Sequence, residues 1–178
     1  AGMLALDVAR IESGLLLIEV DFYSSRKAMI PSQMYTPYEL GMGRLVSPDK
    51  GRFIGQRALR AEHARGPARQ IVGLEIDWNE VEKLYDGAGL APAVAATASR
   101  VATPVYRHGA QIGKATSTTW SPVLKRMIAL ASVDRPHYAD GTELQFEMTV
   151  EAVRHRVRAR VVKTPFFNPA RKTATPPA

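Results

Sequence analysis

The chain has 178 residues, of which 46% are hydrophobic, which is enough for the core of one domain or slightly more. It contains no cysteine, which excludes disulfides, thiolate catalysis and cysteine-ligated zinc and is typical of a reducing compartment, so we predict a cytoplasmic protein. The net charge is +7, and residues 152–178 hold seven basic residues and no acidic one, which indicates an anionic partner or a solvated, charged strand face. No apolar run approaches the roughly 20 residues that span a membrane, so no membrane partner is expected.

The first part of the chain mixes helix and strand signals. Apolar residues at helical spacing predict a short amphipathic helix from Leu4 to Glu12, which Gly14 ends. The apolar run Leu15–Val20 predicts a buried strand, and the polar, proline-containing residues 21–37 predict a loop.

A helix and a boundary follow. Gly41 and Gly43 within an apolar stretch indicate close backbone approach or a bulge. Good helix formers predict a helix over residues 56–64. Gly66-Pro67 ends this unit, and we place a domain boundary there.

The second part of the chain is dominated by strand signals. Residues 71–76 predict a strand, and the long connection 77–99 contains a helical turn at 78–84. The turn His108-Gly109-Ala110 lies between two strand-like runs and predicts a hairpin. Residues 127–133 form a continuous apolar run.

Two alternating runs, 144–150 and 153–162, complete the strand pattern. Several short strands separated by turns predict an antiparallel β-barrel of about six strands, preceded by a mixed α and β segment, which gives an α+β fold class.

Few residue patterns in the chain indicate a catalytic, metal-binding or ligand-binding site. The histidines stand at no metal-ligand spacing, so no metal site is expected. Residues Arg154, Arg156, Arg158 and Arg160 share one strand face, which is typical of a polyanion-binding surface or, as we favour, of an outer barrel face. Arg10 beside Glu12 is read, from these residues alone, as a surface ion pair.

Three segments of the first part have distinctive residue patterns. Residues 10–14 read Arg-Ile-Glu-Ser-Gly, residues 36–43 read Thr-Pro-Tyr-Glu-Leu-Gly-Met-Gly, and residues 50–59 begin with Lys-Gly-Arg-Phe-Ile-Gly and end with Ala-Leu. In this order they resemble the Arg-hydrophobic-Glu-x-Gly, Thr-Pro-x-Glu-x-Gly-Leu-Gly and Lys-Gly-x-Phe-Ile-Gly with Ala-Leu motifs of the glycine cleavage T-protein (aminomethyltransferase) family.

Further matches continue through the second part, so the resemblance covers nearly the whole chain in collinear order. They are Val72-Gly73-Leu74, Pro104-Val105-Tyr106, Ile112-Gly113, Thr116-Ser117, Ser121-Pro122, Ile128-Ala129-Leu130-Ala131, Gly141-Thr142, Val161-Val162 and Pro165-Phe166.

The resemblance implies an organisation and a function. Residues 1–65 would be the C-terminal part of a folate-binding domain, residues 67–170 the C-terminal β-barrel domain, and residues 171–178 a disordered tail. The cofactor would be tetrahydrofolate, which receives a one-carbon unit from a small methylamine or methyl-donor substrate. Related folate-dependent demethylases share this architecture, so the donor stays open, and so does the participation of a lipoyl carrier protein.

The resemblance also carries over candidate folate-binding residues. Arg10 falls on the family's folate-contacting arginine, and Arg171 falls near a C-terminal position that reaches the same ligand. Tyr38 and Glu39 are included as neighbours of the site. No catalytic residue is assigned, because the family's catalytic aspartate lies in an N-terminal half that this sequence does not contain, and Asp7 is not its equivalent.

The sequence departs from the family pattern at three places. Arg44 stands where the family often has Trp, and residues 23–35 and 77–99 are longer than in the simplest members. Because half of the folate cavity and the catalytic aspartate would lie outside this sequence, we expect the parent protein to be an enzyme and this chain by itself to be inactive. The alternatives are a non-enzymatic basic β-barrel that binds nucleic acid or a protein partner, of which nucleic acid is the less expected, and a purely structural barrel.

Overall fold

The computed structural model describes residues 2–172 and residue 174. Its helices are α1 (Met3–Glu12), α2 (Gln56–Arg65) and α3 (Trp78–Gly87), with 3₁₀ helices η1 (Pro31–Gln33), η2 (Gly43–Leu45) and η3 (Ala170–Lys172). Its strands are β1 (Arg69–Ile76), β2 (Thr103–Arg107), β3 (Ala110–Ser121), β4 (Arg126–Asp134), β5 (Glu143–Val150) and β6 (Val153–Val162). Within this part of the chain, no helix has the length and apolar character needed to cross a membrane.

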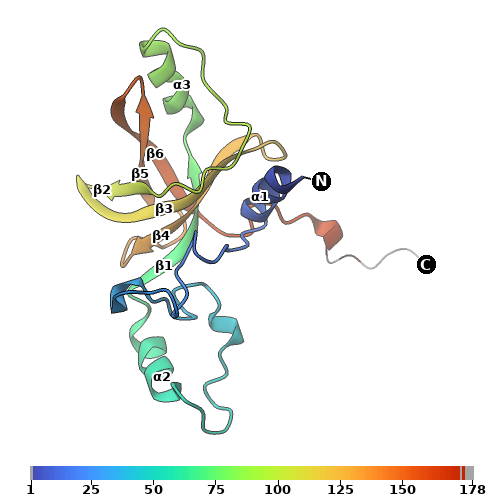
Figure 1. The fold of residues 1–178 in the computed structure, drawn as a ribbon, viewed down its shortest axis with the longest axis vertical. Helices are drawn as coiled ribbons and strands as arrows, with labels where there is room; N and C mark the ends of the chain where they lie inside the picture. The colour runs from blue at the N-terminus through green and yellow to red at the C-terminus, as the bar shows by residue number, and fades with distance from the viewer. Residues whose placement is uncertain (1, 173, 175–178) are drawn as a thin grey trace.

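The six strands close into a barrel in the order β1-β4-β3-β2-β5-β6, as Figure 1 shows. Every neighbouring pair is antiparallel, from the long β3–β4 pair to the short β2–β5 pair, which joins Val105 to Phe146 and Tyr106 to Gln145. Closure leaves no free sheet edge, which is how such sheets avoid pairing with other chains. The predicted α+β class and the antiparallel barrel of about six strands are therefore confirmed.

The barrel interior is filled by small and branched apolar side chains. Alternation along β5 places Leu144 and Phe146 inside, and Val150 at its end is also buried, as the period-two pattern predicts. The buried members that other strands contribute are Val72, Leu74, Ile76, Val105, Ile112, Ala115, Ala129, Ala131, Val133, Val157, Ala159 and Val161.

Helix α3 covers one end of the barrel, and α2 lies apart from the other end. Figure 1 shows α3 at one end and α2 beyond the other. Helix α3 begins at Asp77, whose carboxylate accepts hydrogen bonds from the backbone N–H groups of Asn79 and Glu80, and it buries Val81 in the barrel core. The helical turn predicted at residues 78–84 is confirmed and extends to Gly87.

The predicted buried strand at Leu15–Val20 is wrong. The segment forms turns, and the side chains of Leu15 and Ile18 are 62% and 51% exposed. Its backbone bends because the Leu17 N–H donates to the Asp21 carboxylate at 2.7 Å, so the chain turns toward a buried charge instead of extending.

The arginines of β6 lie on the outer barrel face, as favoured from the sequence. Arg156 stacks on the Tyr106 ring with 3.9 Å from its guanidinium carbon to the ring centroid. Arg158 pairs with Asp77 at 2.8 Å and also with Glu80, and Arg154 lies 3.9 Å from Glu147. Protein carboxylates therefore neutralise part of this face.

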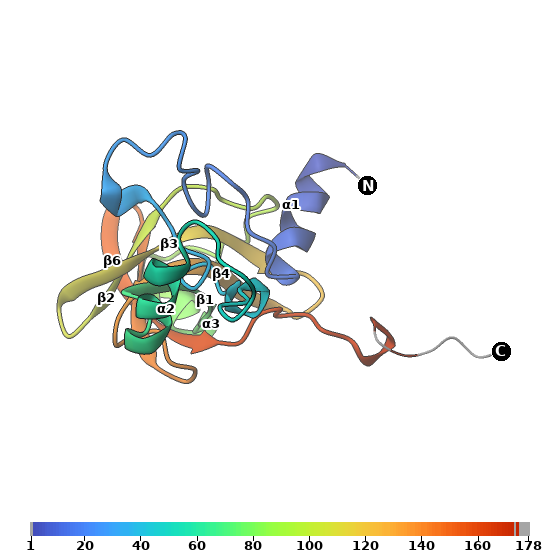
Figure 2. The ribbon, with the colours of Figure 1, turned by 90° about the horizontal axis from the view of Figure 1, so that it is seen from below.

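The chain after β6 passes the C-terminal end of α1 and then runs away from the barrel (Figures 1 and 2). The Phe167 N–H donates to the Glu12 carbonyl at 2.9 Å, which joins this segment to the end of α1. Within the predicted disordered tail, Arg171 and Lys172 belong to η3, whereas residues 173 and 175–178 lie outside the described residues. The tail and the division at Gly66-Pro67 stay predictions.

Candidate functional site: a buried arginine network between α1 and the barrel

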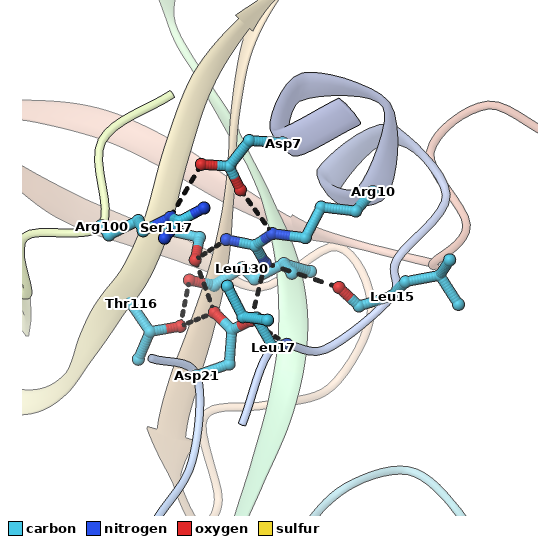
Figure 3. Close-up of polar contacts among 9 residues, drawn as sticks. All are labelled: Asp7, Arg10, Leu15, Leu17, Asp21, Arg100, Thr116, Ser117 and Leu130. Atoms are coloured by element: carbon cyan, nitrogen blue, oxygen red, sulfur yellow. Dashed lines mark hydrogen bonds and ion pairs between the residues drawn. The ribbon is translucent and has the colours of Figure 1, made fainter. Parts of the chain in front are cut away.

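A polar network lies where α1 and the loop after it meet the barrel wall (Figure 3). Helix α1 supplies Asp7 and Arg10, the following loop supplies Asp21, and β3 supplies Thr116 and Ser117. Beside this network, Ile11 of α1 packs against Ile128 and Leu130 of β4 in an apolar cluster that joins the helix to the sheet.

Arg10 is the centre of the network, and its guanidinium makes four contacts. Its Nε donates to Asp7 Oδ1 at 2.7 Å and its Nη1 to Asp21 Oδ2 at 2.7 Å. Its Nη2 donates to the Ser117 hydroxyl at 2.8 Å, and Nη1 also lies 3.4 Å from the Leu15 carbonyl. Because Arg10 is only 9% exposed, the expectation of a surface ion pair with Glu12 is wrong, and the residue instead joins three segments of the chain.

Asp21 is the acidic counterpart of Arg10 and is 1% exposed. Its Oδ1 lies 2.6 Å from each of the hydroxyls of Thr116 and Ser117. Its Oδ2 accepts from Arg10 and from the Leu17 N–H, each at 2.7 Å. A carboxylate has about four acceptor positions, so Asp21 is fully satisfied, and this saturation is what makes its burial tolerable.

Asp7 links the network to the connection between α3 and β2. Arg100 donates to Asp7 Oδ2 at 2.8 Å while Arg10 occupies Oδ1. Burial raises the pKa of the Asp7 carboxyl, but the hydrogen bonds and positive charges of Arg10 and Arg100 outweigh it and hold that pKa below its ordinary value.

The lowered pKa of Asp7 predicts a specific acid sensitivity. The stability that this carboxylate adds is fully present above its unfolded-state pKa of about 4, and it is lost as the pH falls through the lower folded-state pKa. We expect wild type to lose unfolding free energy more steeply than Asp7→Asn below about pH 4. Urea unfolding at a series of acidic pH values measures both slopes, and parallel slopes would contradict the assignment.

The remaining residues of the Arg-x-Glu-x-Gly segment also contact the barrel side of the structure. Glu12 is buried and accepts from the Ser121 hydroxyl at the end of β3 at 2.5 Å. Gly14 has φ +65°, and a Cβ there would lie 2.9 Å from the Thr164 Cβ, so the position needs glycine for both its conformation and its space. The motif thus docks α1 on the barrel.

The other sequence-derived site residues lie elsewhere. Glu39 is buried, accepts from the Thr36 N–H at 3.1 Å and lies 3.4 Å from the Arg69 Nε, at the start of the barrel. The Tyr38 ring packs on His63 with 5.5 Å between ring centroids. Arg171 is on η3, which Figure 2 shows beyond the barrel. Among the described residues, no hydrogen bond or ion pair joins Arg10 to any of these three.

The network is built to hold elements together. Each carboxylate around Arg10 is occupied by an ion pair, and the described residues contain no group of three or more His, Cys, Asp or Glu side chains placed to hold a metal ion. Sequence reasoning missed Asp21 and Ser117 as site residues, because Asp21 begins a polar loop and Ser117 is one of four consecutive hydroxyl residues, and neither segment has a periodic signal. The one usable signal was an aspartate directly after an apolar run.

The comparisons with known proteins agree with this architecture. Residues 69–168 match the family described as the glycine cleavage T-protein C-terminal barrel domain. A curated aminomethyltransferase from a Synechococcus species is 32% identical over 168 residues, which are 93% of this chain and 37% of that protein. An aminomethyltransferase from Shouchella clausii is 35% identical over 74% of this chain and 30% of its own length.

Two further similarities extend the comparison. A trimethylamine-oxide aldolase from Ruegeria pomeroyi is 35% identical over 94% of this chain and 18% of its own length. The crystal structure of the glycine cleavage system aminomethyltransferase T from Bartonella henselae matches with a TM-score of 0.65 and 22% identity, over 92% of this chain and 38% of that one, which shows a shared fold.

The chain thus spans between 18% and 37% of the lengths of these three curated relatives. The family match covers more than half of the chain and coincides with the closed barrel. The resemblance seen in the sequence is confirmed, and the chain belongs to the glycine cleavage T-protein family, whose C-terminal barrel domain it carries.

Proposed function

We propose that this chain is the C-terminal portion of a tetrahydrofolate-dependent one-carbon transferase of the aminomethyltransferase type. Residues 1–65 complete a folate-binding body, and residues 67–170 form the barrel against which that body rests. The observation that carries the proposal is the collinear family relationship, together with the docking of the Arg-x-Glu-x-Gly segment on the barrel through Arg10, Glu12 and Gly14.

The surface of the first part supports this reading. On α1, Met3, Leu4 and Leu6 are 73%, 63% and 57% exposed, and Leu15 and Ile18 in the following loop are also exposed. Clustered exposed apolar side chains mark surfaces that another folded unit covers. In the proposed enzyme this surface packs against the rest of the folate-binding body.

In this proposal, Arg10 contributes to folate binding only if its guanidinium exchanges one of its present hydrogen-bond partners for the ligand. Its bonds to Asp7 and Asp21 are ion pairs, whereas its Nη2 bond to the Ser117 hydroxyl joins it to a neutral acceptor. Because the Nη2 bond lacks the attraction of an opposite charge, it is the one that an anionic ligand group would replace. Tyr38, Glu39 and Arg171 stay proposed contributors to the same cavity.

The proposal assigns no transfer chemistry to this chain on its own. The carboxylates near Arg10 are occupied by ion pairs, and a general base needs a free position within hydrogen-bond reach of its proton. The proposed one-carbon donor is a small methylamine or other methyl donor. A lipoyl carrier protein is a proposed partner for the case in which the parent acts in glycine cleavage.

A chimera tests the proposal. The C-terminal region of the Synechococcus aminomethyltransferase that aligns with this chain is replaced by the chain itself, and tetrahydrofolate binding is measured by calorimetry. We expect the chimera to bind tetrahydrofolate, and the same chimera with Arg10→Lys to bind more weakly, because a lysine cannot reproduce the forked contacts of arginine. A folded chimera that binds no tetrahydrofolate would count against the proposal.

A further inference from the structure

A second candidate site lies at the end of the barrel that α3 covers. A cavity of about 300 Å³ opens there, and we call it the α3 pocket. Its lining residues are Trp78, Tyr85, Ala93, Val94, Ala95, Thr97, Ser99, Thr118, Thr119, Trp120, Met127 and Met148. The volume is at the lower end of the range of small-molecule sites, about 300–1,000 Å³.

Thr118 provides a polar group inside this pocket. It pairs with Ala129, a residue of the barrel interior, so its side chain is on the inner face of β3. Its backbone is satisfied, because Thr118 and Ser99 exchange two hydrogen bonds of 2.8 and 2.9 Å. Its side chain is more than nine-tenths buried, yet its Oγ1 has no hydrogen-bond partner among the described residues. A buried hydroxyl without a partner is costly, and a ligand group would relieve that cost.

The rest of the lining selects a neutral ring. Trp78 and Trp120 meet edge to face with 4.6 Å between ring centroids, and Met127 and Met148 add polarisable thioethers. Among the described residues, no charged side chain lines the pocket, so an ionised ligand would lose its hydration without gaining a counter-charge.

A segment without hydrogen bonds borders the pocket. Residues 91–98 make no hydrogen bond within the described structure, while the chain is held on one side by the Leu90 N–H bond to the Tyr85 carbonyl of 2.9 Å and on the other by the Ser99–Thr118 pair and the Arg100–Asp7 ion pair of 2.8 Å. Such a segment has few hydrogen bonds to break in adapting to a bound molecule. Arg10 makes no hydrogen bond or ion pair with any of the described lining residues, so the pocket is separate from the arginine network.

We propose that the α3 pocket binds a neutral molecule with one aromatic ring and one hydroxyl group, which the Thr118 hydroxyl recognises while the ring packs among the tryptophans and methionines. This ligand is additional to the folate and the one-carbon donor of the proposed function. The inference rests on the cavity, its lining and the unpartnered Thr118 hydroxyl, and it holds whether or not the chain contributes to a folate site.

Tryptophan fluorescence gives a direct test, because the chain has two tryptophans and both line this pocket. The probe is p-cresol, titrated into the whole chain with excitation at the red edge of tryptophan absorption. Toluene lacks the hydroxyl, and 4-methylcyclohexanol lacks the aromatic ring. Thr118→Val removes the hydroxyl at nearly constant shape, and Thr118→Ser is the matched control that keeps it.

We expect a saturable fluorescence change with p-cresol and weaker binding of both comparison molecules. Thr118→Val should weaken p-cresol binding about threefold to tenfold and leave toluene binding within about twofold, since a single neutral hydrogen bond is lost. Thr118→Ser should keep the preference for p-cresol over toluene. Thr118→Val should fold at least as well as wild type, because it removes an unpartnered buried hydroxyl, and circular dichroism checks this.

Three results would overturn the proposal. The first is the absence of a saturable change with p-cresol in wild type. The second is an unchanged p-cresol affinity in folded Thr118→Val. The third is binding of 4-methylcyclohexanol as tight as that of p-cresol, which would show that the pocket does not select an aromatic ring.

Discussion

Replacing Arg10 by alanine is expected to weaken the docking of α1 on the barrel by about 3–5 kcal/mol, because it leaves the Asp21 carboxylate buried without its counter-charge. Asp21 is 1% exposed and would keep only neutral donors from Leu17, Thr116 and Ser117. Hydrogen exchange followed residue by residue measures the effect. The amides of α1 should exchange at least about 100-fold faster, since 1.4 kcal/mol corresponds to a factor of ten.

The barrel strands serve as the internal reference for this variant. Their closed hydrogen-bonded ladder does not depend on Arg10, so the amides of β1 and β6 should change far less than those of α1. Arg57→Ala on α2 is the matched control, because Arg57 is exposed and makes no ion pair within the described structure. If Arg10→Ala altered α1 exchange no more than Arg57→Ala, the network would not be what holds the helix.

The second large effect is expected from Leu74→Ala in the centre of β1. Leu74 is fully buried and pairs with Ala129 on one side and Val161 on the other. Truncating a buried leucine removes its transfer free energy and leaves a cavity, at a cost of about 2–5 kcal/mol. Denaturant unfolding monitored by circular dichroism measures this loss.

Leu74→Met separates packing from strand formation in this experiment. Methionine keeps most of the side-chain volume, so its cost should stay below about 1.5 kcal/mol. Equal losses in Leu74→Ala and Leu74→Met would contradict a tightly packed barrel interior. A loss confined to the exchange of α1, with the barrel unchanged, would show that β1 is not part of the stable core.

Much of the barrel could be predicted from the sequence, because its strands have one face inside and one outside. Along β5, Leu144, Phe146 and Val150 alternate with polar residues, and this alternation holds in the structure. The outward arginines of β6 follow the same rule, and their pairing with Asp77, Glu80 and Glu147 explains why a basic run does not form an unbroken basic surface.

Strand β3 shows why other parts of the barrel and of the candidate site could not be predicted from the sequence. A bulge shifts the register between Ala115 and Ser117, so one extra residue is accommodated and the inside-outside alternation changes phase. Ser117 consequently faces Arg10, while Thr118 faces the interior. Four consecutive hydroxyl residues, from Thr116 to Thr119, carry no hydrophobic pattern from which this switch could be read.

The strand predicted for the loop after α1 was wrong for a different reason. The apolar run Leu15–Val20 satisfied the rule for a strand, but its conformation is set by Asp21, which lies one residue beyond it. The preference of a short apolar segment is weak, and a buried charge that must be satisfied outweighs it. The candidate folate residues came from the family resemblance alone, and the structure places Arg10, the adjacent pair Tyr38 and Glu39, and Arg171 in three separate regions.

Calorimetric titration of the isolated chain with tetrahydrofolate, under reducing conditions and beside Arg10→Lys, tests most directly the claim that this chain holds only part of a folate site. Ordering a ligand costs several kcal/mol, which half of a cavity does not recover, so we predict no binding in the micromolar range for either protein. Micromolar binding by wild type that Arg10→Lys abolishes would contradict the claim, because the chain would then contain a self-sufficient folate site.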